Sequence, residues 1–319
     1  EVEKMKLLNV GELIVDIGSN DGSLLKNFKE NGHNVLGIEP SKAFKEAEKI
    51  EIQTINSYFT KSTVSKILKK NKKAKIVTAA NVFAHIEDPK KLVELICNLM
   101  DKDGVFISES HYLPSLVKTL QYDTIYHEHL RYYHLGVLKK LLEESGLFIF
   151  YVKKIPTHGG SIRVYASKSK KMLEYKNVQM TLDEEKKAGF SDGLVLKNFK
   201  SKIIQSKLEL MNLLSKIKKK NTRIYGIGAP SRASTLISYT GIDDGIIDCI
   251  LELSNSHKLN KYMPGTKIPI LDERKLFTDQ PEYVLLLSWH ISDGLIKNLK
   301  KKGFRGKFII PLPKPTIVN

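Results

Sequence analysis

Residues 13–22, with the sequence LIVDIGSNDG, constrain the fold more than any other stretch of this chain. An apolar run leads into Asp16 and then into two glycines, Gly18 and Gly22, and an amphipathic segment begins at Ser23. This order predicts a strand, a glycine turn and a helix. Because glycine lets a backbone approach a ligand where a Cβ would obstruct it, we expect a ligand at this turn. A structural turn of another α/β domain is the alternative. The spacing D-x-G-x-x-x-G differs from the G-x-G-x-x-G of dinucleotide-binding folds.

A second acidic residue favours an adenosine ligand. The next strand-like run, 34–38, ends at Glu39, about one strand–helix–strand unit after Asp16. A carboxylate in that position accepts hydrogen bonds from both ribose hydroxyls; a glutamate that caps the helix before Ser41 is the alternative. The two motifs resemble those of class I S-adenosylmethionine (SAM) methyltransferases. This resemblance implies that SAM is bound by Asp16, Gly18, Ser19, Asn20, Gly22, Glu39, Pro40 and Asn81.

Composition narrows the class of protein. A chain of 319 residues, 41% of them hydrophobic, is long enough for two packed domains. No apolar run approaches the roughly 18 residues of a membrane span, and no signal peptide is visible, so we expect a cytoplasmic protein. The two cysteines, Cys97 and Cys249, lie far apart and predict neither a disulfide framework nor a metal site. The net charge of +17 comes mostly from short lysine clusters, which indicate a solvated surface or attraction of an anionic small substrate rather than nucleic acid.

The order of strand-like and helix-like runs predicts an α/β protein. Expected strands of the first half are 13–17, 34–38, 52–55, 74–79 and 104–108, and expected helices are 23–31, 41–49, 60–71 and 89–100. This alternation indicates a parallel sheet with helices on both faces. A helix at 135–145 and two strands, 147–154 and 161–166, are similar to the antiparallel end of a methyltransferase sheet.

Beyond residue 177 the pattern changes. Residues 178–220 are charged, with apolar residues at helical spacing, and predict one or two long connecting helices. A second α/β unit follows, with strands at 223–227, 247–252, 283–287 and 307–310 and helices at 232–240 and 292–302. We therefore expect a class I SAM-methyltransferase Rossmann-like domain over 1–176, a helical connector over 177–221, and a smaller Rossmann-like substrate-binding domain over 222–319.

The densest cluster of reactive side chains is Tyr122–Tyr133, with the sequence YDTIYHEHLRYY. Histidine and tyrosine move protons near neutral pH, so we interpret it as an active-site loop. A metal site at His127, Glu128 and His129 is an alternative, but adjacent residues project in different directions. A polar loop without function is another. His85 follows the fourth strand, at the edge where open α/β sheets bind ligands, although a structural histidine would fit there too.

Two glycine-containing turns are further candidates. Residues 157–163, THGGSIR, predict a tight turn followed by Arg163, which is suited to grip an anion; a plain hairpin turn is equally compatible. Residues 225–232, YGIGAPSR, follow a strand and open a helix near Arg232, a combination that suits a phosphate. A structural turn is the alternative there. The third glycine of the dinucleotide fingerprint is missing, so we do not expect NAD.

Together these stretches resemble the SAM-dependent C-methyltransferases of deoxysugar biosynthesis, which act on nucleotide-linked 4-keto sugars. The matching segments are VDIGSNDGSLL, GIEPS, NVFAHIEDP, YDTIYHEHLRYY, THGGSIRVY, GIGAPSRASTL and YMPGTKIPI. The family pattern also places a Cys-rich zinc-binding domain before the SAM domain. No such domain occurs in these 319 residues, so zinc and other metals are not expected here.

The resemblance implies a mechanism. The ketone at C4 acidifies the C3 proton, a base removes it, and the enolate carbon attacks the SAM methyl. By match to the family, His129 is the base, Tyr126 and Glu128 orient the base or the sugar, and His85 hydrogen-bonds the enolate oxygen. The expected substrate-binding residues are His158, Gly159, Arg163, Ser231 and Arg232. Alternatives are a sugar O-methyltransferase, a catalytically silent SAM-binding subunit and an RNA methyltransferase. We expect a monomer with no nucleic-acid or membrane partner.

Overall fold

The computed structural model describes residues 1–169 and 172–319, and they divide into two compact units. The first unit comprises residues 1–114 and 130–191, and the second comprises residues 115–129 and 192–319. The expected boundaries were 1–176, 177–221 and 222–319. The structure instead groups 115–129 with the C-terminal unit and divides the connecting helices between the two units.

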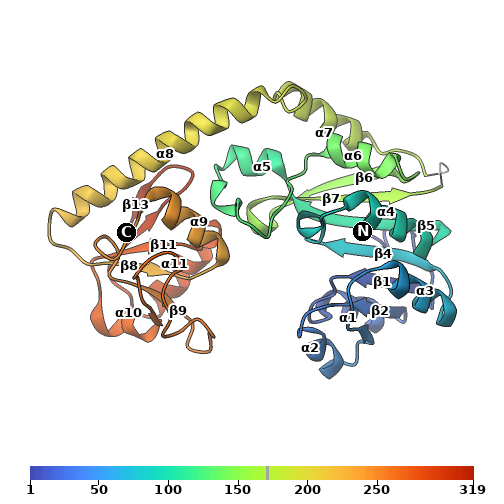
Figure 1. Ribbon diagram of the computed structural model, residues 1–319, viewed down its shortest axis with the longest axis horizontal. Coiled ribbons are helices and arrows are strands. Elements are labelled where there is room, and N and C mark those ends of the chain that lie inside the picture. The colour runs from blue at the N-terminus through green and yellow to red at the C-terminus, as the bar shows by residue number, and fades with distance from the viewer. Residues whose placement is uncertain (170–171) are drawn as a thin grey trace. The chain divides into compact units, whose positions relative to one another are not determined.

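The described residues of the first unit form a seven-stranded sheet in the order β3-β2-β1-β4-β5-β7-β6 (Figure 1). Its strands are β1 (Leu13–Ile17), β2 (Asn34–Ile38), β3 (Thr54–Ile55), β4 (Ala74–Ala80), β5 (Met100–His111), β6 (Phe148–Ile155) and β7 (Ser161–Ser167). The first five strands are parallel, and β7 pairs antiparallel with both β5 and β6. This confirms the predicted methyltransferase sheet and its antiparallel end. The strand expected at 52–55 is shorter, and the one expected at 104–108 is part of a longer strand.

Helices cover both faces of this sheet. They are α1 (Ser23–Glu30), α2 (Phe44–Lys49), α3 (Lys61–Lys70), α4 (Pro89–Leu99), α6 (Leu135–Glu143) and α7 (Lys176–Lys187). One core cluster joins α3, α4, α6 and α7 to side chains such as Val15 and Phe106, and a second joins α1 and α2 to Ile14 and Ile76. Neighbouring residues of β1 thus enter opposite cores, as alternation along a doubly covered strand requires.

The second unit contains a six-stranded sheet in the order β10-β9-β8-β11-β12-β13. Its strands are β8 (Ile224–Ile227), β9 (Cys249–Glu252), β10 (Ile270–Asp272), β11 (Tyr283–Leu286), β12 (Lys307–Ile310) and β13 (Thr316–Val318). Its helices are α8 (Leu194–Lys218), α9 (Ser231–Thr240), α10 (Arg274–Asp279) and α11 (Ser292–Lys301). The predicted Rossmann-like pattern is present; β10, β13 and α10 were not predicted, because three to six residues carry too little periodicity.

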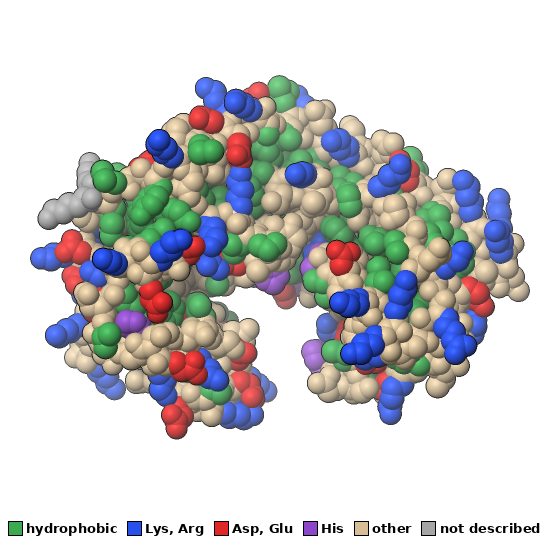
Figure 2. All heavy atoms as spheres, turned by 180° about the vertical axis from the view of Figure 1, so that it is seen from behind, with side chains coloured by type: hydrophobic (Ala, Val, Ile, Leu, Met, Phe, Trp, Pro, Cys, Tyr) green, Lys and Arg blue, Asp and Glu red, His purple; other side chains and the backbone are tan. Residues whose placement is uncertain are grey.

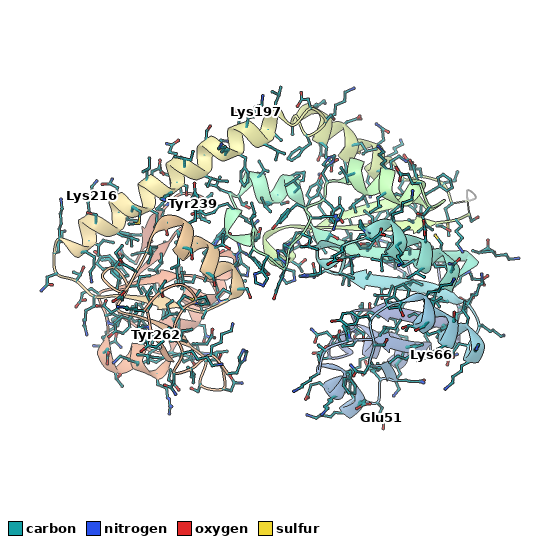
Figure 3. All side chains as sticks on the ribbon, in the orientation of Figure 1. Glu51, Lys66, Lys197, Lys216, Tyr239 and Tyr262 are labelled. Carbon is teal, nitrogen blue, oxygen red and sulfur yellow. The ribbon has the colours of Figure 1, made fainter. Side chains whose placement is uncertain are left out.

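The long helix α8 packs against α9 within the second unit. Figure 3 labels Lys197 and Lys216 toward the two ends of α8, with Tyr239 on α9 beside it. The ammonium of Lys207 lies 4.9 Å from the centre of the Tyr239 ring. In Figure 2, Lys and Arg side chains are scattered over the visible face, as a solvated surface requires. Among the described residues, no helix combines the length and apolar character needed to span a bilayer.

Glu185, buried on α7, caps the start of α6. Its carboxylate accepts hydrogen bonds from the backbone N–H groups of Leu135 (2.6 Å) and Gly136 (3.0 Å), from the Tyr112 hydroxyl (2.9 Å) and from His134 Nδ1 (2.9 Å). Burial raises the pKa of Glu185, but these hydrogen bonds together hold that pKa below its usual value. The carboxylate therefore replaces the cap that His134 does not provide from its own side chain.

Replacing Glu185 with alanine is expected to lower the free energy of unfolding by about 3–5 kcal/mol, because four donors lose their acceptor in the interior. Urea denaturation followed by circular dichroism measures this loss. The matched control is Glu184→Ala, since the neighbouring Glu184 is exposed and its ion pair with Lys154 is worth at most about 1 kcal/mol. Equal losses in the two variants would contradict the capping role.

Candidate active site

A cavity of about 740 Å³ lies in the first unit at the carboxyl ends of its parallel strands. This edge is where open α/β sheets bind ligands. All the expected SAM-binding residues except Gly22 line the cavity, namely Asp16, Gly18, Ser19, Asn20, Glu39, Pro40 and Asn81. The turn after β1, the end of β2 and the end of β4 therefore converge on one hollow.

The two glycines of the turn have different tasks. Gly18 has φ +70°, and a Cβ there would lie 2.9 Å from Cγ2 of Val82, so both conformation and space favour glycine. Gly22 has φ +78° at the start of α1, and a Cβ there would lie 3.0 Å from Cβ of Ala47 and 3.2 Å from Ile52. Gly22 therefore lets α1 pack closely on its neighbours and lies behind the cavity lining.

Two carboxylates lie in the cavity wall. Asp16 is only 3% exposed, and the Thr78 hydroxyl donates a 2.6 Å hydrogen bond to it. Burial, with a smaller contribution from the charge of Glu39, raises the pKa of Asp16 to about 7 despite that bond. Glu39 accepts backbone N–H bonds from Asn20 (3.0 Å) and Ser41 (2.8 Å). These bonds fix the Glu39 carboxylate at the end of β2.

The chemistry of the cavity lining fits a polar ligand. Ser19 and Asn81 belong to the lining, and Oγ of Ser19 and Oδ1 of Asn81 are buried without a hydrogen-bond partner among the described residues. The Glu39 carboxylate lies in the same lining and suits a ligand with hydrogen-bond donors. Adenosine and methionine groups meet that requirement, and the residues present therefore fit SAM.

Sequence reasoning missed part of the lining. Ser57, Tyr58 and Phe59 follow β3, and Leu24, Ile86 and Leu92 add apolar surface. A signal for the first three existed, because a strand was expected at 52–55 and the residues after it had to lie at the same edge as Glu39.

Two expected site histidines also line the cavity, His85 after β4 and His158 in the turn between β6 and β7. The ring of His158 lies 5.5 Å from that of His111. The turn has positive φ at His158, Gly159 and Gly160, as a tight hairpin turn requires, and His158 adds to the cavity wall. Arg163 on β7 donates two hydrogen bonds to Glu109 (3.1 and 2.8 Å), so its guanidinium already has an anionic partner.

The other expected catalytic residues belong to the second unit. Tyr126, Glu128 and His129 lie in its 115–129 segment, with Glu128 exposed and the other two half-buried. His129 Nδ1 lies 2.9 Å from the Thr124 carbonyl oxygen, and its Nε2 lies 3.2 Å from the Tyr126 hydroxyl. Because a carbonyl only accepts, Nδ1 carries the proton and the Nε2 lone pair receives the Tyr126 hydroxyl. Burial raises the pKa of Tyr126, which keeps it a donor.

Ser231 and Arg232 open α9 in the same unit. Ser231 is exposed, but the Arg232 side chain is buried and donates from Nε and Nη2 to Asp123, at 2.8 and 2.7 Å. The expectation that Arg232 binds a substrate phosphate is therefore not retained, since its guanidinium is engaged by a buried carboxylate. Among residues 1–169 and 172–319, no group of three His, Cys, Asp or Glu side chains is arranged to hold a metal ion.

The strand order, the antiparallel last strands and the SAM-compatible cavity define a class I SAM-dependent methyltransferase. Residues 2–151 match the family model of a methyltransferase domain, and residues 156–313 match that of a C-methyltransferase C-terminal domain. The chain is 31% identical to C-methyltransferase NovU of Streptomyces niveus, over 100% of this chain and 76% of that protein. It therefore belongs to the C-methyltransferase family.

Solved structures align with about half of the chain. A SAM-dependent methyltransferase from Clostridium acetobutylicum aligns with 52% of this chain and 88% of its own, at 17% identity and a TM-score of 0.42. A SAM-dependent methyltransferase from Archaeoglobus fulgidus aligns with 51% and 89%, at 17% identity and a TM-score of 0.40.

Proposed function

We propose that this C-methyltransferase acts at C3 of a nucleotide-linked 4-keto sugar, and that His129 is the base. The observation that carries this proposal is the 2.9 Å contact between His129 Nδ1 and the Thr124 carbonyl oxygen, which assigns the proton to Nδ1 and makes Nε2 the basic nitrogen. Carbon methylation needs a base to create the nucleophile, and an imidazole with one committed nitrogen is suited to that task. The sugar and nucleotide parts rest on the resemblance of the 122–133 and 157–165 motifs.

The proposed reaction has two steps. His129 Nε2 removes the C3 proton, and the electrons of the C–H bond pass to the C4 oxygen to form an enolate. The enolate carbon then uses an electron pair to bond to a methyl carbon, and the electron pair of the broken carbon–sulfur bond stays on sulfur. When bound, SAM supplies that methyl group, activated by its sulfonium charge. Tyr126 and Glu128 orient the base or the sugar, and His85 hydrogen-bonds the enolate oxygen.

On the substrate side we propose His158, Gly159, Arg163 and Ser231. Arg163 differs from the buried Arg232, because its side chain stays 34% exposed beside its carboxylate partner. The place of His158 in the cavity wall supports a position near the reacting sugar. Exposed Ser231 at the start of α9 supports a role toward the nucleotide part. We further propose a cytoplasmic monomer that binds neither nucleic acid nor membranes, which gel filtration and cell fractionation test.

The test is a mass-spectrometric screen of 4-keto nucleotide sugars with SAM, joined to proton exchange at C3. In deuterated water without SAM, the correct keto sugar should lose its C3 proton at a rate that depends on the enzyme. Methyl transfer to a hydroxyl without C3 exchange would favour the O-methyltransferase. Tight SAM binding with no transfer to any sugar would favour the silent binding subunit.

We propose that the Glu39 carboxylate accepts the ribose hydroxyls of SAM. Glu39→Ala is then expected to weaken SAM binding roughly 10- to 100-fold, the loss of hydrogen bonds to a charged group. Isothermal titration calorimetry measures it, with Glu46→Ala on the exposed face of α2 as the control. SAM affinity unchanged by Glu39→Ala would rule out the ribose contact.

A further inference from the structure

Asp123 lies in the histidine-rich segment 115–129 of the second unit. It is a fully buried carboxylate, and both of its oxygens accept hydrogen bonds. It is 0% exposed. It accepts hydrogen bonds from Arg232 Nε (2.8 Å) and Nη2 (2.7 Å) and from the indole N–H of Trp289 (2.7 Å). The Arg232 guanidinium carbon also lies 5.0 Å from the centre of the Trp289 ring. The Asp123 carboxylate thus joins three segments that are far apart in the chain.

The same segment contacts α9 at two more places. The rings of Tyr122 and Tyr239 lie 5.3 Å apart, edge to face. The Thr235 hydroxyl donates to the Ile125 carbonyl at 3.3 Å. Within the segment, the end of helix α5 (Leu113–Lys118) is followed by a single 3-10 turn at Tyr122–Thr124, and no regular structure is assigned beyond it. The position of this segment on the second unit therefore depends on these side-chain contacts. The ion pair at Asp123 is the strongest type among them, because hydrogen bonds between charged groups are stronger than neutral ones.

Asp123 is linked to the proposed base through a single residue. Thr124 follows it directly, and the Thr124 carbonyl oxygen is the acceptor for His129 Nδ1–H. The Thr124 carbonyl oxygen therefore has little freedom to move while the neighbouring Asp123 carboxylate is held by its hydrogen bonds. Displacement of the segment would move that oxygen and remove the contact that sets the tautomer of His129.

We propose that Asp123, Arg232 and Trp289 form an anchor that positions His129 by fixing the Thr124 carbonyl. The three are positioning residues, because their contacts are with one another and reach His129 through the Thr124 carbonyl. The anchoring part stands on the contacts alone, whereas its effect on the reaction rests on the proposed function. Arg232 thereby receives a role for this chain different from a phosphate ligand.

The test combines a structural readout with a kinetic one. Asp123→Asn keeps the shape but removes the charge, and Arg232→Lys keeps the charge but removes the paired donors. Trp289→Phe removes the indole N–H and part of the ring but keeps an aromatic side chain beside Arg232. Hydrogen exchange of the backbone amides of 115–129 should accelerate in all three, least in Trp289→Phe. C3 proton exchange of the keto sugar should fall by about 100-fold in the first two, the cost of a displaced catalytic group, and its pH profile should shift. SAM affinity should remain within about twofold, because the SAM cavity belongs to the other unit.

The control is Asp279→Asn in the same unit, where Asp279 accepts from the Tyr225 hydroxyl (2.6 Å) away from the segment. It should change neither readout. If Asp123→Asn does not fold, Trp289→Phe still reports on the anchor. Unchanged amide protection of 115–129 in the anchor variants would overturn the proposal whatever the substrate is. Faster amide exchange with an unaltered C3 exchange rate and pH profile would overturn the positioning role. A wild type that exchanges no C3 proton in any keto sugar would instead contradict the proposed function.

Discussion

The variant His129→Asn is expected to lose C3 proton exchange and methyl transfer by about 100- to 10,000-fold while it still binds SAM, as removal of a general base predicts. The asparagine amide can still donate to the Thr124 carbonyl in place of Nδ1, so the loop keeps its contact. What disappears is the basic nitrogen that faces Tyr126. Initial rates with the keto sugar and calorimetry with SAM separate the two effects.

The control for this prediction is His127→Asn, because His127 is exposed and lies two residues away in the same segment. It should leave the rate of exchange within about threefold of wild type, the usual outcome for an exposed residue outside the chemistry. Near-normal turnover in His129→Asn would remove His129 from the role of base.

The second large effect concerns Asp16 and pH. In the protein without SAM, burial raises the Asp16 pKa from 3.8 to about 7. Between those values the folded chain holds a proton that the unfolded chain has lost. The free energy of unfolding therefore falls as pH rises through this window, by about 1.4 kcal/mol per unit and about 4 kcal/mol in all. Asp16→Asn removes this titration, so it should be the more stable protein at pH 8 and show a flatter profile from pH 4 to 7.

Urea titrations at several pH values, without SAM, measure this difference. Asp183→Asn on the exposed face of α7 is the control and should follow the wild-type profile. Because we propose that Asp16 also holds SAM, the stabilised variant should bind SAM more weakly, a stability gain at the expense of binding. A wild-type profile identical to that of Asp16→Asn would show that Asp16 is ionised throughout the window.

Local sequence signals predicted most of the fold and most of the lining of the cofactor cavity. The strand, glycine turn and helix around Gly18 and the carboxylate at Glu39 depend on neighbouring residues, and they lie where the pattern predicted. Topology then brings Asn81 and His85 to the same edge, because parallel strands end together. The same rule places Tyr58 at this edge, because it follows β3, but the sequence analysis did not predict it as part of the cavity.

Pairings between distant residues left no such signal. Asp123 and Arg232 lie 109 positions apart, and nothing in either local pattern marks them as partners. Arg232 follows a glycine-containing turn at a helix start, a context that phosphate sites share, so local chemistry favoured an external anion. The structure shows that the anion beside Arg232 is the buried carboxylate of Asp123 in the same chain. Glu185 is similar, since its role as the cap of α6 depends on a helix 50 residues away.

The discontinuous second unit bears on how relatives of this protein can exchange parts. A chimera that joins residues 1–191 of one homologue to the remainder of another would combine a 115–129 segment from the first with an α9 and a Trp289 position from the second. The residue at the Asp123 position of one homologue would then face the side chains that the other homologue carries at the Arg232 and Trp289 positions. The second unit is encoded by two separate stretches of the gene. Recombination at residue 191 would therefore separate the segment with the proposed base from the residues that we propose to position it.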